Sequence, residues 1–487
     1  MNKAFAKNDK QRLAQLLPAV RGHALEGWGA YWELRSRLDT ALPDEVNEFY
    51  RRYEGSYVED RLRNDWLLLL GQRRDWSNFA DQYPKFRMND DREVRCYAIA
   101  IELITKPQEG DALALEARKN WFAQRDADDG CLVAAENMLR EKKFTAADIW
   151  RKARHSIEAN RARAARNAVS LLDAELAPQV MEINDSPTKF LTKRVTAPGR
   201  AAKEMVVLAL VRLANSDAEG AAAMLENHWS VHLSPEQRAW AWGAIGKQSA
   251  LNLTPYASEH FAKADNRHLS DDLLGWKVRA ALRNGAWPQV QPAIEAMSTE
   301  VGKEPIWTYW KARAMLRGKD EAARAQATAL LESIAGLRGF YEKLALEDLG
   351  RQATLPERPA PLTPEEKQAA LQNPGLQRAL QAIGLGIRAE GVREWNYTTN
   401  LHRRGGMSER DLLAAADVAC QRQVWDRCIN TSERTKDAFD VEQRFPMPHK
   451  EAVLVRSREI GLDPAYVYGL IRQESRFITD ARSGVGA

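Results

Sequence analysis

The sequence contains no long apolar run. Its longest run, from Met205 to Val211, has seven residues, whereas a helix that crosses a bilayer needs about 18. The first ten residues, which include Lys3, Asp9 and Lys10, have no apolar core, so we expect no secretory signal at this end. The sequence therefore predicts no transmembrane segment.

A strong excess of charge of one sign is also absent. The 487 residues carry 71 basic and 67 acidic side chains, which gives a formal net charge of +4. So small an excess on a long chain predicts no nucleic-acid partner. Apolar residues make up 44% and charged residues 28% of the chain, and these shares exclude a disordered chain or a fibre.

Cysteine is scarce, with four residues in the whole chain. Cys96 and Cys131 lie far apart in the sequence, whereas Cys420 and Cys428 are eight residues apart. None of them has the CxxC spacing of a zinc site, so we expect no metal site built on cysteine. Each pair is compatible either with a disulfide in an oxidising compartment or with two buried thiols, and the sequence leaves both open.

Alternating β-branched patterns are rare, and helical periodicity runs through almost every segment. Turn residues such as Ser234-Pro235 and Asn284-Gly285 interrupt this periodicity at short intervals. Helices of about 10–15 residues joined by about 2–8 residues are typical of antiparallel helix pairs. The sequence therefore predicts an all-α fold.

The most abundant aromatic residue, tryptophan, shows a regular spacing. Trp32 and Trp66, Trp242 and Trp276, and Trp276 and Trp310 are each 34 residues apart. A helix-turn-helix period of 34 residues is the tetratricopeptide spacing. One helix pair cannot bury its own apolar face, but stacked pairs can. We therefore expect an α-solenoid of stacked helix pairs, in which one tryptophan opens a helix and a second follows the next turn.

Prolines cluster between Arg351 and Gly375, where they predict an extended linker. Helical patterning resumes at Leu376, and Phe445-Pro446 marks a second boundary. The predicted division is a helical solenoid over 1–355, a proline-rich linker with a small helical domain over 356–445, and a further unit that begins over 446–487.

Two other patterns favour ordinary structural roles. Arginines and a lysine crowd residues 151–166 without interleaved aromatics for base stacking, which predicts a solvated helix face. His228 and His232 would share a helix face, but Trp229 stands where a zinc protease of the HExxH type has its glutamate. We expect no metal and no cofactor.

The segment from Gly461 to Phe477 carries the strongest chemical signal. Asp463 is a good N-cap, and Pro464 suits the first position of a helix. Val467, Leu470 and Ile471 form the apolar face of that helix. Their helical spacing places Glu474 where the next core residue is expected. Burial there would raise the pKa of the carboxyl and suit it to general acid catalysis. The alternative is a glutamate that faces solvent at the end of a helix.

The run from Tyr468 to Phe477, with Gln473-Glu474-Ser475 at its centre, and the following Asp480 to Ala487 resemble the first catalytic motif of the soluble lytic transglycosylases. This resemblance implies a horseshoe of paired helices, a helical linker domain and the beginning of a lysozyme-like α domain. It also implies a periplasmic enzyme whose partners are the glycan strands of peptidoglycan and cell-wall proteins bound through the solenoid.

By the same resemblance, Glu474 is the single catalytic acid/base, and Ser475 supports its position. The enzyme would cleave the β-1,4 bond between N-acetylmuramic acid (MurNAc) and N-acetylglucosamine (GlcNAc) and form 1,6-anhydro-MurNAc. Glycosidases that use two carboxylates need a second acid. Here the attacking hydroxyl belongs to the substrate, so one glutamate suffices.

The chain ends at Ala487, soon after Glu474, and the segments that wall the glycan groove in the family would follow later. We therefore expect a C-terminally truncated chain that is inactive alone. Two alternatives stay open. The first is a non-enzymatic helical-repeat scaffold that binds protein partners or glycan, and the second is an ordinary hydrolysing lysozyme.

Overall fold

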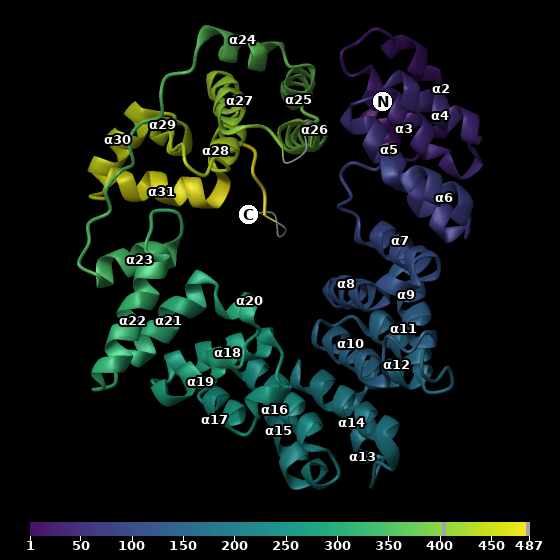
Figure 1. Cartoon of the computed structure of the whole chain (residues 1–487), viewed down its shortest axis with the longest axis vertical. Helices are drawn as coiled ribbons and strands as arrows, with labels where there is room; N and C mark the ends of the chain where they lie inside the picture. Colours follow the sequence, from purple (N-terminus) through teal and green to yellow (C-terminus); the bar gives the residue numbers. More distant parts are fainter. Residues whose placement is uncertain (402–405, 484–487) are drawn as a thin grey trace. The chain divides into compact units, whose positions relative to one another are not determined.

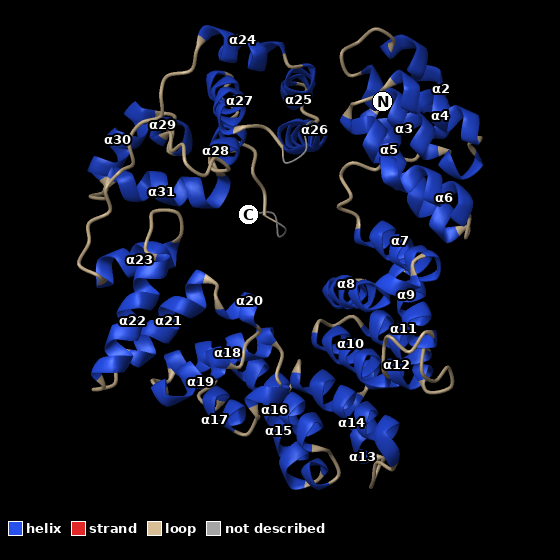
Figure 2. Cartoon of the chain, in the orientation of Figure 1, coloured by secondary structure: helices blue, strands red, loops and turns tan. Residues whose placement is uncertain are grey.

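The structure is a computed structural model that describes residues 1–401 and 406–483. Within these ranges all regular structure is helical and no strand occurs (Figures 1 and 2). The all-α prediction is thus confirmed. None of the helices in the described part of the chain has the length and apolar character needed to cross a membrane.

The chain forms two compact units. Unit 1 comprises Met1–Arg95 and Leu355–Ala487, and unit 2 comprises Cys96–Thr354. Unit 1 combines both ends of the chain, so the two units do not test the predicted division into 1–355, 356–445 and 446–487. That division stays a prediction.

The helices of unit 1 are α1 (Asn2–Ala6), α2 (Lys10–Leu16), α3 (Glu26–Ser36), α4 (Pro43–Arg52), α5 (Tyr57–Gln72), α6 (Trp76–Gln82), α24 (Pro364–Gln372), α25 (Pro374–Gly384), α26 (Arg388–Leu401), α27 (Glu409–Gln421), α28 (Trp425–Ser432), α29 (Val441–Arg444), α30 (Lys450–Glu459) and α31 (Pro464–Ser475), with the 3₁₀ helices η1 (Leu17–Val20), η2 (Leu38–Thr40) and η3 (Tyr83–Lys85). The boundary between the units falls within α7 (Arg92–Thr105).

The helices of unit 2 are α8 (Gly110–Ala123), α9 (Asp129–Arg140), α10 (Ala146–Glu158), α11 (Ala162–Ser170), α12 (Ala177–Asp185), α13 (Pro187–Thr192), α14 (Gly199–Ala214), α15 (Ala218–Asn227), α16 (Pro235–Leu251), α17 (Ala257–Ala262), α18 (Asp271–Arg283), α19 (Val290–Glu295), α20 (Thr299–Gly302), α21 (Pro305–Met315), α22 (Glu321–Ile334) and α23 (Phe340–Asp348), with the 3₁₀ helices η4 (Pro107–Glu109), η5 (Trp229–Val231), η6 (Asn266–His268) and η7 (Trp287–Gln289).

Proline and N-cap residues begin several of these helices. Ser234 accepts a hydrogen bond from the Gln237 amide in a capping box, and Pro235 takes the first position of α16. Residues 351–363 form no regular helix, as the proline cluster predicts. The predicted restart at Leu376 is too late, because Pro364 and Pro374 occupy first helical positions, where a missing amide donor costs nothing.

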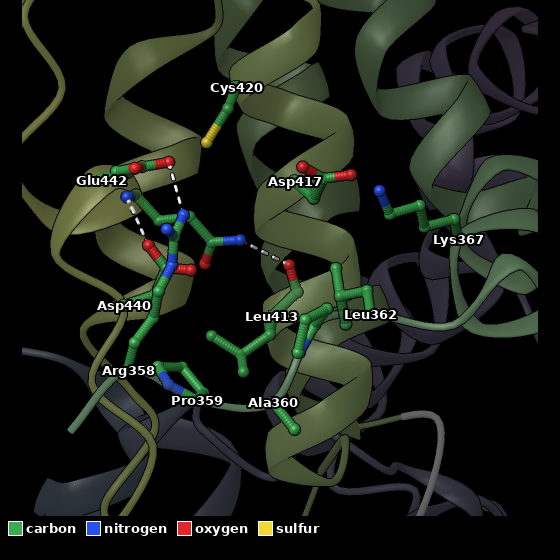
Figure 3. Close-up of a pocket in the computed structure, with 12 residues that line it drawn as sticks. Arg358, Pro359, Ala360, Leu362, Lys367, Leu413, Asp417, Cys420, Asp440 and Glu442 are labelled. Carbon is green, nitrogen blue, oxygen red and sulfur yellow. Dashed lines mark hydrogen bonds and ion pairs between the residues drawn. The ribbon is translucent and has the colours of Figure 1, made fainter.

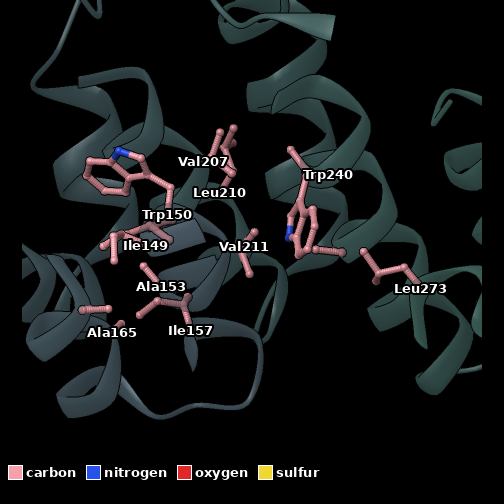
Figure 4. Packing of buried hydrophobic residues seen from close by; sticks show 14 of the residues in the cluster. Ile149, Trp150, Ala153, Ile157, Ala165, Val207, Leu210, Val211, Trp240 and Leu273 are labelled. Carbon is pink, nitrogen blue, oxygen red and sulfur yellow. The ribbon is translucent and has the colours of Figure 1, made fainter. Parts of the chain in front are cut away.

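Helix α14 is the centre of the core of unit 2. It contacts α10, α15 and α16, and α16 in turn contacts α18, so each long helix packs against its successors as in a helical repeat. The longest apolar run of the sequence lies in α14, and every residue from Val206 to Val211 is fully buried. Figure 4 shows Val207, Leu210 and Val211 of this run between side chains of the neighbouring helices.

The tryptophan spacing marks equivalent places on stacked helices. Trp32 and Trp66 lie on α3 and α5, which contact each other, and Trp242 and Trp276 lie on α16 and α18, which also do. The prediction that the first tryptophan opens a helix is wrong, because Trp66 and Trp276 lie inside helices. Trp66 is buried, and Trp276 packs against a cluster that includes Ala257 and Phe261 of α17.

The second tryptophans, Trp76 and Trp287, do begin the following elements α6 and η7.

The two histidines considered for a metal site do not share an α-helical face. Helix α15 ends at Asn227, directly before His228, and His232 follows η5. Among the residues that the structure describes, no group of three or more His, Cys, Asp or Glu side chains could hold a metal ion.

The basic stretch over 151–166 is not a wholly solvated face. Arg154 is buried in α10 and forms two hydrogen bonds with the carboxylate of Glu204 in α14, at 2.9 and 2.7 Å. The side chains are only 2% and 0% exposed. Gln237 of α16 also donates to Glu204, at 3.0 Å. The prediction of a solvated face is therefore wrong for Arg154, because a carboxylate from another helix compensates its charge.

Lys152 is buried too, and its ammonium group donates to the carbonyl oxygens of Trp121 and Gln124 at 2.5 and 2.9 Å.

Both cysteine pairs form disulfides. Cys96 and Cys131 join α7 to α9 with a Cα–Cα distance of 4.8 Å. Cys420 and Cys428 join α27 to α28 with a Cα–Cα distance of 5.0 Å. The structure thus selects the disulfide over the two buried thiols at each pair.

We predict that Glu204→Gln lowers the free energy of unfolding by up to about 3–5 kcal/mol, because the guanidinium of Arg154 loses its fully buried counter-charge. Arg154 then keeps only Glu236, at 3.0 Å, whose side chain is 44% exposed. Urea unfolding followed by circular dichroism measures this loss. Arg267→Ala is the control, since its ion pair with Asp265 is on the surface, with Arg267 82% exposed, and should contribute at most about 1 kcal/mol. A loss for Glu204→Gln no larger than the control's would contradict the role of the buried pair.

The native protein purified without reductant should contain no thiol that reacts with iodoacetamide. After reduction under denaturing conditions, mass spectrometry should show four alkylated cysteines, because both bridges are then open. Alkylation of any cysteine in the unreduced, denatured chain would show that its bridge does not form.

Candidate catalytic helix

The predicted candidate site lies on α31, which begins as the sequence predicts. The carboxylate of Asp463 accepts a hydrogen bond from the Ala465 amide at 2.8 Å, and Pro464 is the first helical residue. The helix ends at Ser475. Glu474 and Ser475 are therefore the last two residues of this helix.

One face of α31 is attached to the segment that follows α28. Tyr468 donates a hydrogen bond to the Pro448 carbonyl at 2.9 Å, and Arg472 donates to the Arg444 carbonyl at 2.8 Å. The guanidinium of Arg472 also lies 4.7 Å from the ring centre of Phe445, a cation–π distance. These contacts fix both the position of the helix and its rotation about its own axis.

Glu433, which follows α28, binds two arginines of this helix region. Its carboxylate pairs with Arg472 and, at 2.9 Å, with Arg476. Burial acts to raise the pKa of Glu433, but the hydrogen bonds from Arg476 and Arg472 outweigh it and hold the pKa below its ordinary value of 4.5. Glu433 is thus an ionised bridge between the linker and the candidate helix.

Glu474 lies on the opposite face of α31. Successive residues of a helix are rotated by about 100°, so Glu474 points away from the face that carries Arg472. Its side chain is exposed, as is Leu470, which is 50% exposed. The expected burial of Glu474 on an apolar stripe is wrong for this structure, because the helix is attached through Tyr468, Arg472 and Arg476 instead.

Ser475 supports the end of the helix. Its hydroxyl donates to the Ile471 carbonyl at 3.2 Å and accepts from the Phe477 amide at 3.2 Å. Arg476 and Phe477 then adopt left-handed conformations, with φ of 49° and 63°, which cost energy in residues other than glycine. The Ser475 hydroxyl and the Glu433 carboxylate hold this turn in place directly after Glu474.

The arrangement offers one accessible carboxylate on a rigidly attached helix, which is suited to giving and taking a proton. The sequence did not reveal Glu433. Its only local signal is the four-residue spacing of Arg472 and Arg476, which places them on one face but does not identify their partner. The motif residues 484–487 lie outside the described residues.

No protein-family model matches the sequence. The chain is similar to the soluble lytic murein transglycosylase of Salmonella typhimurium, with 22% identity over 510 aligned positions, which cover 100% of this chain and 74% of the relative. It is also similar to the soluble lytic murein transglycosylase of Escherichia coli, with 24% identity over 320 positions. That match covers 64% of this chain and about half, 47%, of the relative.

A solved structure gives the same result. The lytic transglycosylase Slt of Pseudomonas aeruginosa, solved as an inactive mutant with glutamate replaced by glutamine, superposes with a TM-score of 0.66 and 26% identity. The match covers 100% of this chain and 78% of that chain. Over its whole length the chain is thus similar in sequence and in fold to soluble lytic murein transglycosylases.

Proposed function

We propose that the protein is a lytic transglycosylase that acts on murein, and that Glu474 is its single acid/base. The observation that carries this proposal is the similarity to enzymes of this name along the whole chain. The inactive Slt mutant supports the assignment of a glutamate, because one exchange to glutamine accompanies its loss of activity. Glu474 is the glutamate of the matching motif in this sequence.

In the first step of the proposed reaction, the Glu474 carboxyl donates its proton to the oxygen that links MurNAc to GlcNAc. The bond between this oxygen and the anomeric carbon of MurNAc breaks, and GlcNAc leaves with a new hydroxyl group. The exposed face of α31 leaves room for a glycan strand. A strand lying on it would exclude water from Glu474, and loss of water favours the neutral form of a carboxyl.

In the second step the Glu474 carboxylate takes the proton of the C6 hydroxyl of MurNAc. The C6 oxygen attacks the anomeric carbon and closes the 1,6-anhydro ring, so the proton balance is restored without water. The acetamido group of the substrate can assist. A hydrolase, in contrast, needs a second carboxylate to activate water or to act as nucleophile.

We also propose that Ser475 and Glu433 are positioning residues and that residues 446–487 begin the catalytic domain. Both residues bind the backbone or side chains next to Glu474 and hold the end of α31. The proposed location is the periplasm, where the murein lies. The two disulfides support it, since disulfides persist in oxidising compartments.

Glu474→Gln should lower the rate of murein solubilisation by about 100- to 10,000-fold, because an amide cannot replace a general acid/base. The measurement follows the turbidity of isolated murein sacculi with the protein expressed from its complete reading frame. Glu451→Gln, which changes an exposed glutamate at the start of α30, is the matched control and should keep the full rate. An unchanged rate for Glu474→Gln would refute the assignment of the residue.

Glu433→Gln should change the dependence of stability on pH. The pKa of Glu433 is lowered in the folded protein, so its ion pairs stabilise the fold fully above pH 4.5, and this contribution is lost as the pH falls through the folded pKa. The difference in melting temperature between the wild type and Glu433→Gln should therefore be largest near neutral pH and shrink in acid. A difference that is independent of pH would show that the Glu433 charge does not hold α31.

A further inference from the structure

A pocket of about 290 Å³ lies within the linker part of unit 1, and none of its lining residues belongs to α31. Its walls are the extended segment 358–362, helix α27 and the beginning of α29 (Figure 3). This pocket plays no part in the chemistry proposed for Glu474. We call it the linker pocket.

The walls of the linker pocket are held by specific contacts. Arg410 of α27 donates to the carbonyl oxygens of Ala360 and Pro361 at 2.7 and 2.9 Å, and it pairs with Glu366. Cys420, which also lines the pocket, is tied to α28 by its disulfide. The extended segment is thus fixed against α27, and the pocket is a built feature of the linker.

Carboxylates lie on two walls of the pocket. Asp417 comes from α27, whereas Asp440 and Glu442 come from the start of α29, and Figure 3 shows them on opposite sides of the space. Asp417 accepts a hydrogen bond from Gln421 at 2.7 Å, and Asp440 accepts one from the Gln443 amide at 3.0 Å. Each carboxylate has further lone pairs that can accept hydrogen bonds.

The charge of Asp440 acts on Asp417. Burial is the largest cause that raises the pKa of Asp417, and the negative charge of Asp440 adds to it, against the opposing charge of Lys367. A second positive charge in this space would relieve the repulsion between the two carboxylates.

Gln443 provides an independent observation. Its side chain lines the pocket, is only 7% exposed, and donates to the Leu413 carbonyl at 3.0 Å. Its other polar atom, Oε1, is buried and has no hydrogen-bond partner. An unpaired buried acceptor costs about 1–3 kcal/mol, which a hydrogen-bond donor entering the pocket would recover.

The cations of the pocket lie at its rim. Arg358 pairs with Glu442 at 2.9 Å, but the two side chains are 72% and 77% exposed. Lys367 is exposed as well. The interior therefore presents mainly acceptors, and the rim carries a guanidinium that could meet a peptide carbonyl or carboxylate.

We propose that the linker pocket binds a primary ammonium group carried by a peptide. Such a group has three donors and no acceptor, which matches a space lined by Asp417, Asp440 and the unpaired oxygen of Gln443. Under the proposed function, on which this identification of the source rests, the ammonium group belongs to one of the short peptides that join the glycan strands of murein. The pocket would then bind the peptide part of the polymer while α31 acts on the glycan.

The test uses the full 487-residue chain and two small probes. Nα-acetyl-L-lysine amide carries the ammonium group, and Nα,Nε-diacetyl-L-lysine amide lacks it. In ligand-observed NMR titrations, the first probe should bind and the second should not. Asp417→Asn should weaken binding of the first probe by about tenfold, because it removes a charged hydrogen-bond partner.

Asp440→Asn should weaken binding in the same way, and it keeps an oxygen that can cap α29, since asparagine is also a good N-cap. Asp437→Asn, an exposed carboxylate that does not line the pocket, should bind as the wild type does. Equal binding of both probes, or unchanged binding by both pocket variants with intact melting curves, would overturn the proposal.

This measurement is independent of catalysis. Loss of the binding result refutes the linker pocket and leaves the lytic activity untouched. A protein that binds the ammonium probe but releases no murein fragments from sacculi would keep the pocket and refute the proposed function instead.

Discussion

The carboxylate of Glu433 is central to the contacts that orient the candidate acid. It binds Arg472 within α31 and Arg476 directly after it, and so determines which face of the helix is attached to the linker. Because Glu474 lies on the other face, the same ion pairs leave its carboxyl accessible. The ion pairs of Glu433 with Arg472 and Arg476 therefore help to orient Glu474.

In unit 2, buried apolar side chains hold the helices together, and the ion pair of Arg154 with Glu204 favours one way of stacking them. The interior of α14 has apolar neighbours on all sides, yet Glu204 at the same helix is fully buried. Its bonds with Arg154 and Gln237 connect α10, α14 and α16 at one point. A stacking register that separated Arg154 from Glu204 would bury an unpaired charge, which costs about 3–5 kcal/mol, so the pair favours one stacking of these helices.

Local signals in the sequence predicted local structure well. Asp463 and Pro464 predicted the start of α31, and the 34-residue tryptophan spacing predicted helices stacked in pairs. Contacts between distant residues could not be predicted in this way. Arg154 was expected in solvent because its partner Glu204 lies on another helix. Glu474 was expected in the core because the helical pattern does not reveal that Glu433 attaches the opposite face.

The disulfides and the linker pocket belong to the same group of unpredicted features. Spacing alone left the pairing of Cys420 and Cys428 open, and only the corner between α27 and α28 brings them together. Likewise, Asp417 and Asp440 line one pocket because α27 contacts α29, and the extended segment held by Arg410 forms a further wall. In each case the sequence contains the groups, but their distance in space depends on the tertiary structure.

The central claim is that one glutamate cleaves murein by using a hydroxyl group of the substrate itself. The most direct measurement is mass spectrometry of the fragments released from murein sacculi in water enriched in heavy oxygen, with the protein expressed from its complete reading frame. The account predicts 1,6-anhydro-MurNAc ends that contain no heavy oxygen. Reducing MurNAc ends that carry the heavy isotope would contradict it, because they would show that water, activated by a second carboxylate, is the nucleophile.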